Sequence, residues 1–167
     1  VCMEELLEKT VELASNDYDL KKKYDFRQII IQREYEENAP AVICEATKMQ
    51  QVLLNILKNG AQAMADKFQG DPDFQPRFIL RVKREGNKGR IEIEDNGPGM
   101  DETTRKRAFE PFFTTKEIGV GTGLGLSVSY FIVTENHNGT MHVESKPGQG
   151  ANFVICLPAR DNMKSNI

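Results

Sequence analysis

Strand patterns come in pairs along this chain, and their order constrains the fold more than any other feature of the sequence. Segments 78–82 and 91–93 alternate apolar and polar residues, as half-buried strands do. Asn87-Lys88-Gly89 between them is typical of a hairpin turn. A second pair is predicted at 139–145 and 151–157. A dinucleotide-binding fold needs strict alternation of strands and helices, so this order argues against one.

Helices are predicted around the strand pairs. Residues 46–66 place apolar side chains at helical spacing, and 69–76 contain two prolines and a glycine that indicate a loop. We expect an α/β fold built as a two-layer sandwich, with a mixed, mostly antiparallel sheet and helices packed on one face. The remaining expected elements are helices at 3–15, 102–108 and 124–135, a strand at 26–36 and a short strand at 41–44.

Composition limits the class of protein and its partners. A length of 167 residues suits one domain, and 22 basic against 25 acidic residues give a net charge of -3, so nucleic-acid binding has no support. Three widely spaced cysteines form neither a disulfide framework nor a zinc motif, which indicates a reducing compartment. The most apolar stretch, 124–133, is about half a membrane span. We therefore expect a cytoplasmic domain without membrane contact, and, because the chain begins with Val, part of a longer protein.

Two asparagines on the long helix form the first cluster with chemical potential. Asn55 and Asn59 are four residues apart, so their amides project from one face, with Gln62 and Ala63 a turn later. A neutral amide oxygen suits a hard cation whose charge a nucleotide already balances. An isolated Asn pair on a helix is more often a solvated polar face, so its meaning depends on the other clusters.

An acidic residue at a strand end forms the second cluster. Asp95 ends a predicted strand and begins the motif Asp95-Asn-Gly-Pro-Gly-Met100. Gly97 and Gly99 would let the backbone turn with positive φ and approach a flat ligand closely. On its own, the motif is equally consistent with an ordinary turn.

The segment from 96 to 125 is rich in glycine and holds the other two clusters. A connection this long is typical of a functional lid. Phe109-Glu-Pro-Phe-Phe-Thr-Thr-Lys116 combines aromatics, which alone could form a local hydrophobic cluster, with a lysine able to reach a phosphate. Gly119-Val-Gly-Thr-Gly-Leu-Gly-Leu-Ser127 opens a helix, whose unpaired N–H groups would bind an anion. Its spacing excludes a Walker loop, a dinucleotide fingerprint and a protein-kinase glycine loop.

In this order the four clusters resemble the N box, first glycine box, F box and second glycine box of the sensor histidine kinases. That family belongs to the GHKL ATPase superfamily, with gyrase, the heat-shock chaperone ATPases and the mismatch-repair ATPases. The motifs are QVLLNILKNGAQAM, DNGPGM, FEPFFTTK and GTGLGLS, and the match covers roughly residues 1–158. The resemblance implies a Bergerat fold that binds Mg-ATP under a mobile lid at about 100–122, in a catalytic domain at 1–160 followed by a tail at 161–167.

The resemblance also implies roles for individual residues. Asn59 matches the Mg²⁺ ligand, with Asn55 as its helper one turn earlier, and Asp95 matches the aspartate that accepts a hydrogen bond from the adenine amino group. A carboxylate suits that donor and would repel the carbonyl of guanine, so ATP is preferred over GTP. Further nucleotide contacts are implied for Ala63, Gly97, Gly99 and Met100, and phosphate contacts for Lys116, Gly121, Thr122, Gly123, Leu124, Gly125 and Leu126.

Position 55 separates two functions that the resemblance allows. Hydrolytic members of the superfamily carry a glutamate there as general base, whereas the Asn55 amide cannot take a proton from water. We therefore expect transfer of the γ-phosphoryl group of ATP to a protein histidine in two-component signal transduction. A conformational ATPase of the gyrase or chaperone type is the alternative, and a degenerate nucleotide-binding module is a third, which the intact motifs disfavour.

Two further positions depart from the family pattern. Gly60 replaces the usual Ala after the N box Asn, which costs the helix about 1 kcal/mol but keeps the position small. Ala151 stands where many relatives have Thr or Ser near the adenine aspartate, so one hydroxyl contact is expected to be missing.

The two histidines, His137 and His142, lack the sequence setting of the family's phosphoacceptor helix and flank a predicted turn at Asn138-Gly139. The acceptor is therefore expected on separate dimerisation helices of a homodimeric parent kinase that signals onward to a response regulator. The sequence leaves open whether this parent is anchored in a membrane. Catalysis would rest on positioning and electrostatics, with Mg²⁺ and Lys116 offsetting charge on the γ-phosphate.

Overall fold

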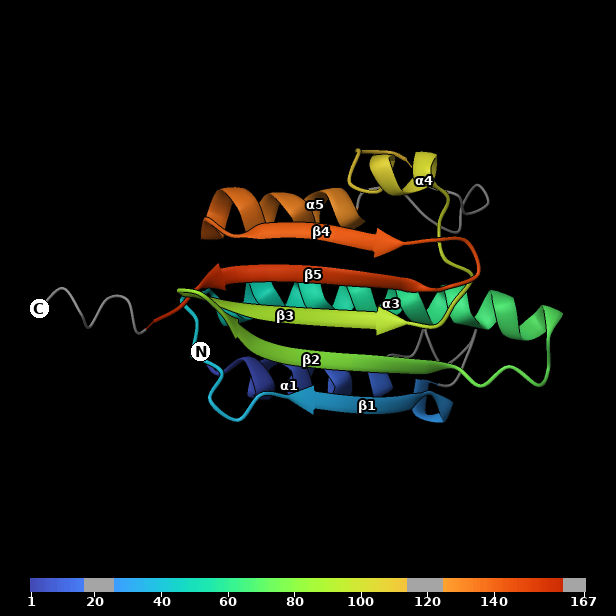
Figure 1. Cartoon of the computed structure of the whole chain (residues 1–167), viewed down its shortest axis with the longest axis horizontal. Coiled ribbons are helices and arrows are strands. Elements are labelled where there is room, and N and C mark those ends of the chain that lie inside the picture. Colours follow the sequence, from blue (N-terminus) through green and yellow to red (C-terminus); the bar gives the residue numbers. More distant parts are fainter. Residues whose placement is uncertain (17–25, 114–124, 161–167) are drawn as a thin grey trace, which may run out of the picture.

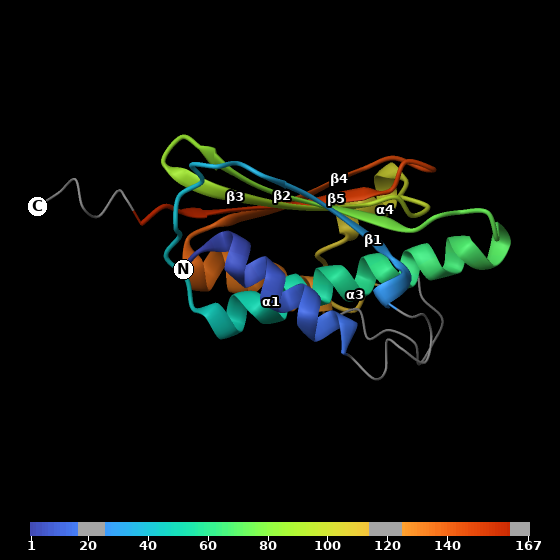
Figure 2. The same cartoon turned by 90° about the horizontal axis from the view of Figure 1, so that it is seen from below.

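The computed structural model describes residues 1–16, 26–113 and 125–160, and the chain forms two layers in it (Figures 1 and 2). The elements in chain order are α1 (Met3–Ser15), the 3-10 turn η1 (Phe26–Gln28), β1 (Ile30–Tyr35), α3 (Ala46–Gly70), β2 (Arg77–Glu85), β3 (Lys88–Asp95), α4 (Glu102–Arg107), α5 (Gly125–Phe131), the π-helical turn η2 (Ile132–Asn136), β4 (Thr140–Ser145) and β5 (Ala151–Pro158).

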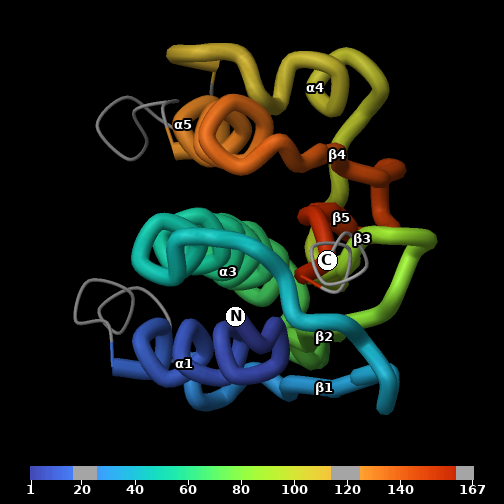
Figure 3. The backbone as a smooth tube through the Cα atoms, turned by 90° about the vertical axis from the view of Figure 1, so that its left-hand side faces the viewer, coloured from blue at the N-terminus to red at the C-terminus, as the bar shows by residue number. Residues whose placement is uncertain are grey.

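The strands form one sheet in the order β1-β2-β3-β5-β4. The edge strand β1 pairs parallel with β2, and the other three pairs are antiparallel. α1, α3 and α5 lie side by side on one face, as the end-on view in Figure 3 shows. The expected two-layer sandwich with a mixed, mostly antiparallel sheet is confirmed.

The core lies between α3 and the inner face of the sheet. Phe78, Leu80 and Val82 of β2 and Ile91 and Ile93 of β3 are all buried, as their alternation predicts. Each such side chain stabilises the fold by about 1.5–3 kcal/mol relative to an exposed one. The facing stripe of α3 consists of Met49, Val52, Leu53, Ile56, Leu57 and Met64.

Two predicted strands differ from the structure. The strand predicted at 26–36 begins only at Ile30, because residues 26–28 turn through η1 and the Phe26 ring packs beside Phe78, 5.9 Å between centroids. The strand predicted at 41–44 was wrong: this segment makes one isolated bridge, from Val42 to Ala159.

Helix ends and one turn also differ. α3 continues past residue 66 to Gly70, because the first proline after residue 66 is Pro72 and the helix ends just ahead of it. The β2–β3 turn was predicted at 87–89, but Gly86 takes a φ of +62° and β3 already begins at Lys88. α5 changes into η2 after Phe131 instead of continuing as α-helix.

Part of the predicted lid and all of the predicted tail cannot be compared with the structure. α4 falls within the predicted lid segment and lies beyond the β4 edge of the sheet (Figure 1). Residues 114–122 and 161–167 lie outside the described residues. None of the helices in the described part is both long enough and apolar enough to cross a membrane.

Candidate functional site

Asp95 ends β3 on the side of the sheet where the β4–β5 hairpin also turns (Figure 1). It is only 6% exposed. The Gly97 N–H donates to its Oδ1 at 2.9 Å, and the main chain of Ala151, its partner in the β3–β5 ladder, adds a second hydrogen bond. Burial raises the pKa of this carboxyl to about 6, although both hydrogen bonds lower it. At neutral pH the strand end therefore holds an ionised, oriented hydrogen-bond acceptor.

Gly60 lets α3 approach this carboxylate. A Cβ at position 60 would lie 2.6 Å from Cε1 of Phe78 and 3.3 Å from Oδ2 of Asp95. Because the Phe78 ring is fully buried, it has little room to move. The helix-weakening glycine is thus explained by close packing between α3 and the strand end.

The two glycines after Asp95 act differently from each other. Gly99 has a φ of +75°, as predicted, but the same prediction was wrong for Gly97, whose φ is not positive. Gly97 is needed for space, since a Cβ there would lie 2.9 Å from Oδ1 of Asp95 and 3.6 Å from Cβ of Ala63. The turn therefore presses against both the carboxylate and α3.

Asn55, Asn59 and Ala63 form one stripe along α3, because residues four apart share a helix face. Ala63 lies beside Gly97 at one end. At the other end, Nδ2 of Asn55 donates to Oγ of Ser129 at 3.3 Å, and it lies 3.5 Å from the Gly125 carbonyl oxygen at the start of α5. The stripe of Asn55, Asn59 and Ala63 thus runs along α3 from the turn after Asp95 to α5.

The side-chain amides of Asn55 and Asn59 would hold a hard cation only if a ligand supplied anionic oxygens as well. Amide oxygens are neutral ligands, and the residues described contain no group of three or more His, Cys, Asp or Glu side chains placed to bind a metal ion. The donor set therefore fits a Mg²⁺ ion that brings its own anionic oxygens, as a nucleotide-bound ion does.

Five predicted site residues lie outside the described residues, namely Lys116, Gly121, Thr122, Gly123 and Leu124. Gly125 begins α5, and Leu126 packs partly buried against the core. Met100 is also partly buried, and the next residue, Asp101, caps α4 by accepting the Thr104 N–H at 2.7 Å.

The aromatic residues before the gap divide into anchored and exposed ones. Phe109 stacks on Tyr130 at 5.0 Å between centroids and meets Phe153 edge-on at 6.4 Å. The Arg107 guanidinium lies 4.4 Å from the centroid of Phe113. Phe112 is 75% exposed and has a φ of +65°, a conformation that costs a non-glycine residue about 1–3 kcal/mol. A local hydrophobic cluster thus accounts for Phe109 but not for Phe112.

Neither histidine lies at this site. Nδ1 of His137 is 2.8 Å from the Ile132 carbonyl oxygen, and Nε2 accepts the Glu45 N–H at 3.0 Å, so the buried ring ties η2 to the start of α3. His142 lies on β4 with Nε2 3.1 Å from Glu144. The expected turn and strand start around Asn138-Gly139 is present.

Sequence reasoning missed two residues beside Asp95. Nζ of Lys67 donates to the Asn96 carbonyl oxygen at 3.2 Å. The Asn96 side chain accepts the Arg77 N–H at 2.9 Å and donates to the Gln75 carbonyl oxygen at 3.0 Å, which pins the α3–β2 connection to the turn. Lys67 could have been found one helical turn after Ala63, whereas nothing in the sequence singles out Asn96.

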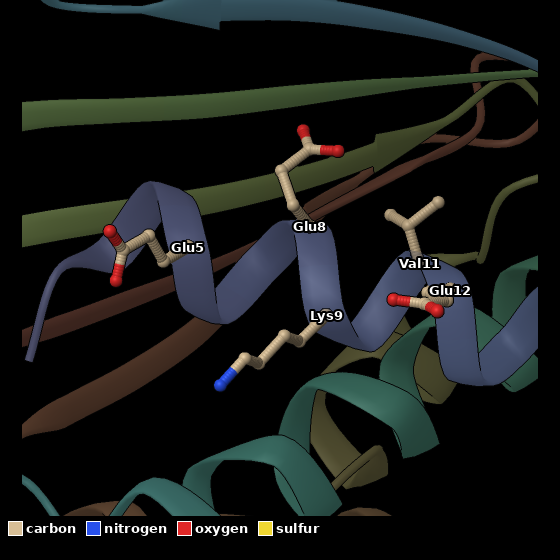
Figure 4. A pocket seen from close by; sticks show the side chains of 5 residues that line it. All are labelled: Glu5, Glu8, Lys9, Val11 and Glu12. Atoms are coloured by element: carbon tan, nitrogen blue, oxygen red, sulfur yellow. The ribbon is translucent and has the colours of Figure 1, made fainter.

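A surface hollow on α1 lies away from this site. Figure 4 shows that Glu8 points toward the sheet, whereas Lys9 extends to the opposite side of the helix. Glu8 is already bound to Arg33 at 2.6 Å and to the Tyr35 hydroxyl at 2.7 Å. The hollow therefore offers a solvated helix face, lined by Glu5, Glu8, Lys9, Val11 and Glu12.

Known proteins share both the sequence pattern and the fold. The family described as histidine kinase-, DNA gyrase B-, and HSP90-like ATPase matches residues 44–161. Sporulation kinase E of Bacillus subtilis is 36% identical over 158 residues, which are 95% of this chain and 19% of that protein. The catalytic domain of histidine kinase ThkA is 25% identical with a TM-score of 0.73, over 94% of both chains. Full-length ShkA in complex with AMPPNP is 26% identical with a TM-score of 0.74, over 95% of this chain and 30% of that one.

Proposed function

The chain belongs to the family of histidine kinase-, DNA gyrase B-, and HSP90-like ATPases, and on that premise we propose that it binds Mg-ATP and transfers the γ-phosphoryl group to a histidine of another domain. It spans 19% of sporulation kinase E and 23% of the histidine-protein kinase AtoS of Escherichia coli. The chain would therefore act as the catalytic domain of a longer two-component sensor kinase.

The environment of Asp95 carries the proposal. Burying a carboxylate costs stability, and here burial raises the pKa of Asp95 to about 6, a perturbation that is typical of functional sites. Gly97 orients one oxygen, and the glycine at position 60 leaves room beside the other. Such an acceptor suits the exocyclic amino group of adenine and would repel the guanine carbonyl. The complex of the relative ShkA with AMPPNP, an adenine nucleotide analogue, supports this proposal.

The stripe on α3 would hold the phosphate end of the nucleotide. Asn59, with Asn55 one turn earlier, would hold Mg²⁺, which would offset negative charge on the phosphates when bound. The start of α5 at Gly125 and Leu126 would add backbone N–H donors, and Lys116, Gly121, Thr122, Gly123 and Leu124 are proposed to complete this end.

Asn55 supports transfer rather than hydrolysis. Its amide nitrogen donates to Ser129, and an amide has no basic lone pair to activate water. The residues of this chain would then bind and orient ATP and exclude water. An imidazole from another domain would attack the γ-phosphorus in line, the bond from this phosphorus to the bridging oxygen would break, and ADP would leave. A gyrase-like or chaperone-like conformational ATPase would instead need a general base.

The acceptor histidine is proposed to lie on dimerisation helices of the parent kinase. His137 is buried with both ring nitrogens engaged, which makes it a poor nucleophile for ATP. The parent would be a homodimer that passes its phosphoryl group to a response regulator. The net charge of -3 gives no support for nucleic-acid binding by this domain, and we propose a cytoplasmic location.

Two measurements test the proposal. Calorimetry with Mg²⁺ present should register binding of ADP and ATP to the folded chain, and much weaker binding of GDP and GTP. With γ-labelled ATP the chain should not label itself, but it should label a phosphoacceptor domain added in trans. Absence of nucleotide binding would refute the proposal, and rapid release of inorganic phosphate without acceptor would favour the conformational ATPase.

A further inference from the structure

The loop of the β4–β5 hairpin packs closely against the turn that follows Asp95 and is hydrogen-bonded to it. The Gly148 N–H donates to the Pro98 carbonyl oxygen at 2.6 Å. A Cβ at Gly99 would lie 2.1 Å from the Lys146 carbonyl oxygen, and one at Gly150 would lie 2.0 Å from the Asp95 carbonyl oxygen. The two loops therefore approach too closely for side chains at these points, and the hairpin packs directly against the turn.

Ser145 supplies a side-chain link between these loops. Its hydroxyl accepts the Met100 N–H at 2.8 Å and donates to the Gly150 carbonyl oxygen at 2.6 Å. One oxygen thus closes the hairpin and fixes the last residue of the turn. Ser145 is the final residue of β4, so its backbone is itself held by the ladder to β5.

The position of Met100 gives this link a functional meaning. Residues 95–99 form the carboxylate end of the site, and the next residue, Asp101, caps α4. Met100 is therefore where the adenine-side turn ends and the proposed lid begins. A hydrogen bond at this point fixes both the depth of the turn and the base from which the lid departs.

We propose that Ser145 is a positioning residue for nucleotide binding, which holds the turn at Asp95–Met100 in its binding geometry through the Met100 N–H. This inference rests on the proposed adenine site. A bound adenylate would meet a turn that needs no reordering, so affinity would be gained by preorganisation and lost mainly through faster dissociation when the hydroxyl is removed.

Ser145→Ala, Ser145→Thr and Ser15→Ala test the proposal. Ser15 is the matched control, because its hydroxyl donates to the Val11 carbonyl oxygen at 2.8 Å on α1, away from the site. Affinity for Mg-ADP is measured by calorimetry, and dissociation of a fluorescent ADP analogue by stopped flow, at a temperature where melting curves show every variant folded. Loss of two hydrogen bonds should weaken ADP binding by about tenfold in Ser145→Ala, mostly as faster dissociation.

Ser145→Thr keeps the hydroxyl and should bind ADP within about twofold of the wild type, as should Ser15→Ala. Wild-type affinity in Ser145→Ala, or failure of Thr to rescue, would overturn the inference. Hydrogen exchange gives a readout that needs no variant: the Met100 amide of the nucleotide-free wild type should be protected, and rapid exchange there would also overturn it. If the wild type itself binds no ADP, the proposed function fails instead.

Discussion

At the scale of single residues, Asp95 shows a conflict between stability and function. Its carboxylate is buried and its pKa raised to about 6, because two main-chain hydrogen bonds do not replace the lost solvation. The folded protein thus binds this proton more tightly than the unfolded chain does. Its contribution to stability is most favourable below about pH 4, falls as pH rises through about 4 to 6, and stays reduced above that.

Asp95→Asn should therefore raise stability while removing nucleotide binding. A shift from 3.8 to about 6 corresponds to roughly 3 kcal/mol at pH 7, as an upper bound, since Asn must still be accommodated. Asn can keep the Gly97 hydrogen bond, but its NH₂ group would face the adenine amino group. We expect a higher Tm at pH 7 and no detectable ADP binding. The exposed Asp73→Asn is the control, and a variant that melts lower or binds ADP normally would contradict this account.

Nucleotide affinity should depend on the protonation of Asp95. Below about pH 6 the Asp95 carboxyl is protonated and would present a hydrogen-bond donor to the adenine amino group, which is itself a donor. ADP affinity should therefore fall by up to about tenfold per pH unit. The ligand phosphates also titrate, so the comparison is between proteins with the same ligand. Lys67 lowers the pKa of Asp95 and Glu94 raises it. The midpoint of the affinity profile should move up in Lys67→Met and down in Glu94→Gln. Identical profiles would show that Asp95 does not control binding.

At the scale of elements, the site is made by the approach of α3 to the end of β3. Helix propensity alone favours Ala over Gly at position 60 by about 1 kcal/mol. Packing opposes it, since a Cβ would lie 2.6 Å from the buried Phe78 ring. Overpacking of this kind costs about 1–3 kcal/mol and also pushes α3 away from Asp95.

Gly60→Ala should thus lower the free energy of unfolding by up to about 2 kcal/mol and weaken ADP binding, despite the better helix former. Gly70→Ala is the matched control on the same helix, because a Cβ there would meet nothing within 4 Å. That variant should be neutral or slightly stabilising. Chemical denaturation measures the free energy of unfolding of both variants, and a stabilised Gly60→Ala would contradict the packing argument.

The elements could largely be predicted from sequence, because alternation and helical spacing report burial directly. The stripe of Asn55, Asn59 and Ala63 follows from spacing, and its place beside Asp95 came only from the order of the motifs. Contacts that depend on tertiary approach were not predictable. Ser145 and Asn96 bind main-chain groups of residues far away in the sequence. Gly97 is required because a side chain there would not fit beside Asp95, and not because its φ is positive. No local pattern encodes such partners.

At the scale of the whole molecule, exposed apolar side chains occur on α5 and on the segment that follows α4. Phe131 is 57% exposed and Val128 41%, both on α5, and Phe112 is more exposed still. α4 lies next to α5 in two perpendicular views (Figures 1 and 3), and Phe109 stacks on Tyr130 of α5. Large exposed apolar side chains on neighbouring elements indicate an interaction surface. The same helix α5 begins at Gly125, where the phosphates are proposed to lie.

The double variant Val128→Ser, Phe131→Ser should reduce phosphoryl transfer to an acceptor domain in trans by about tenfold or more, with ADP affinity unchanged. The reason is that docking of a partner would bury these side chains, which is worth about 1.5–3 kcal/mol for each, whereas the nucleotide contacts proposed here do not include them.

Leu13→Ser is the control. It removes a comparably exposed apolar side chain on α1, 48% exposed, and should change neither phosphoryl transfer nor ADP affinity. Equal loss of transfer in Leu13→Ser would point to general destabilisation. Weaker ADP binding in the double variant would place the effect in the nucleotide site. A selective loss of transfer would support docking of the acceptor domain on this face of α5.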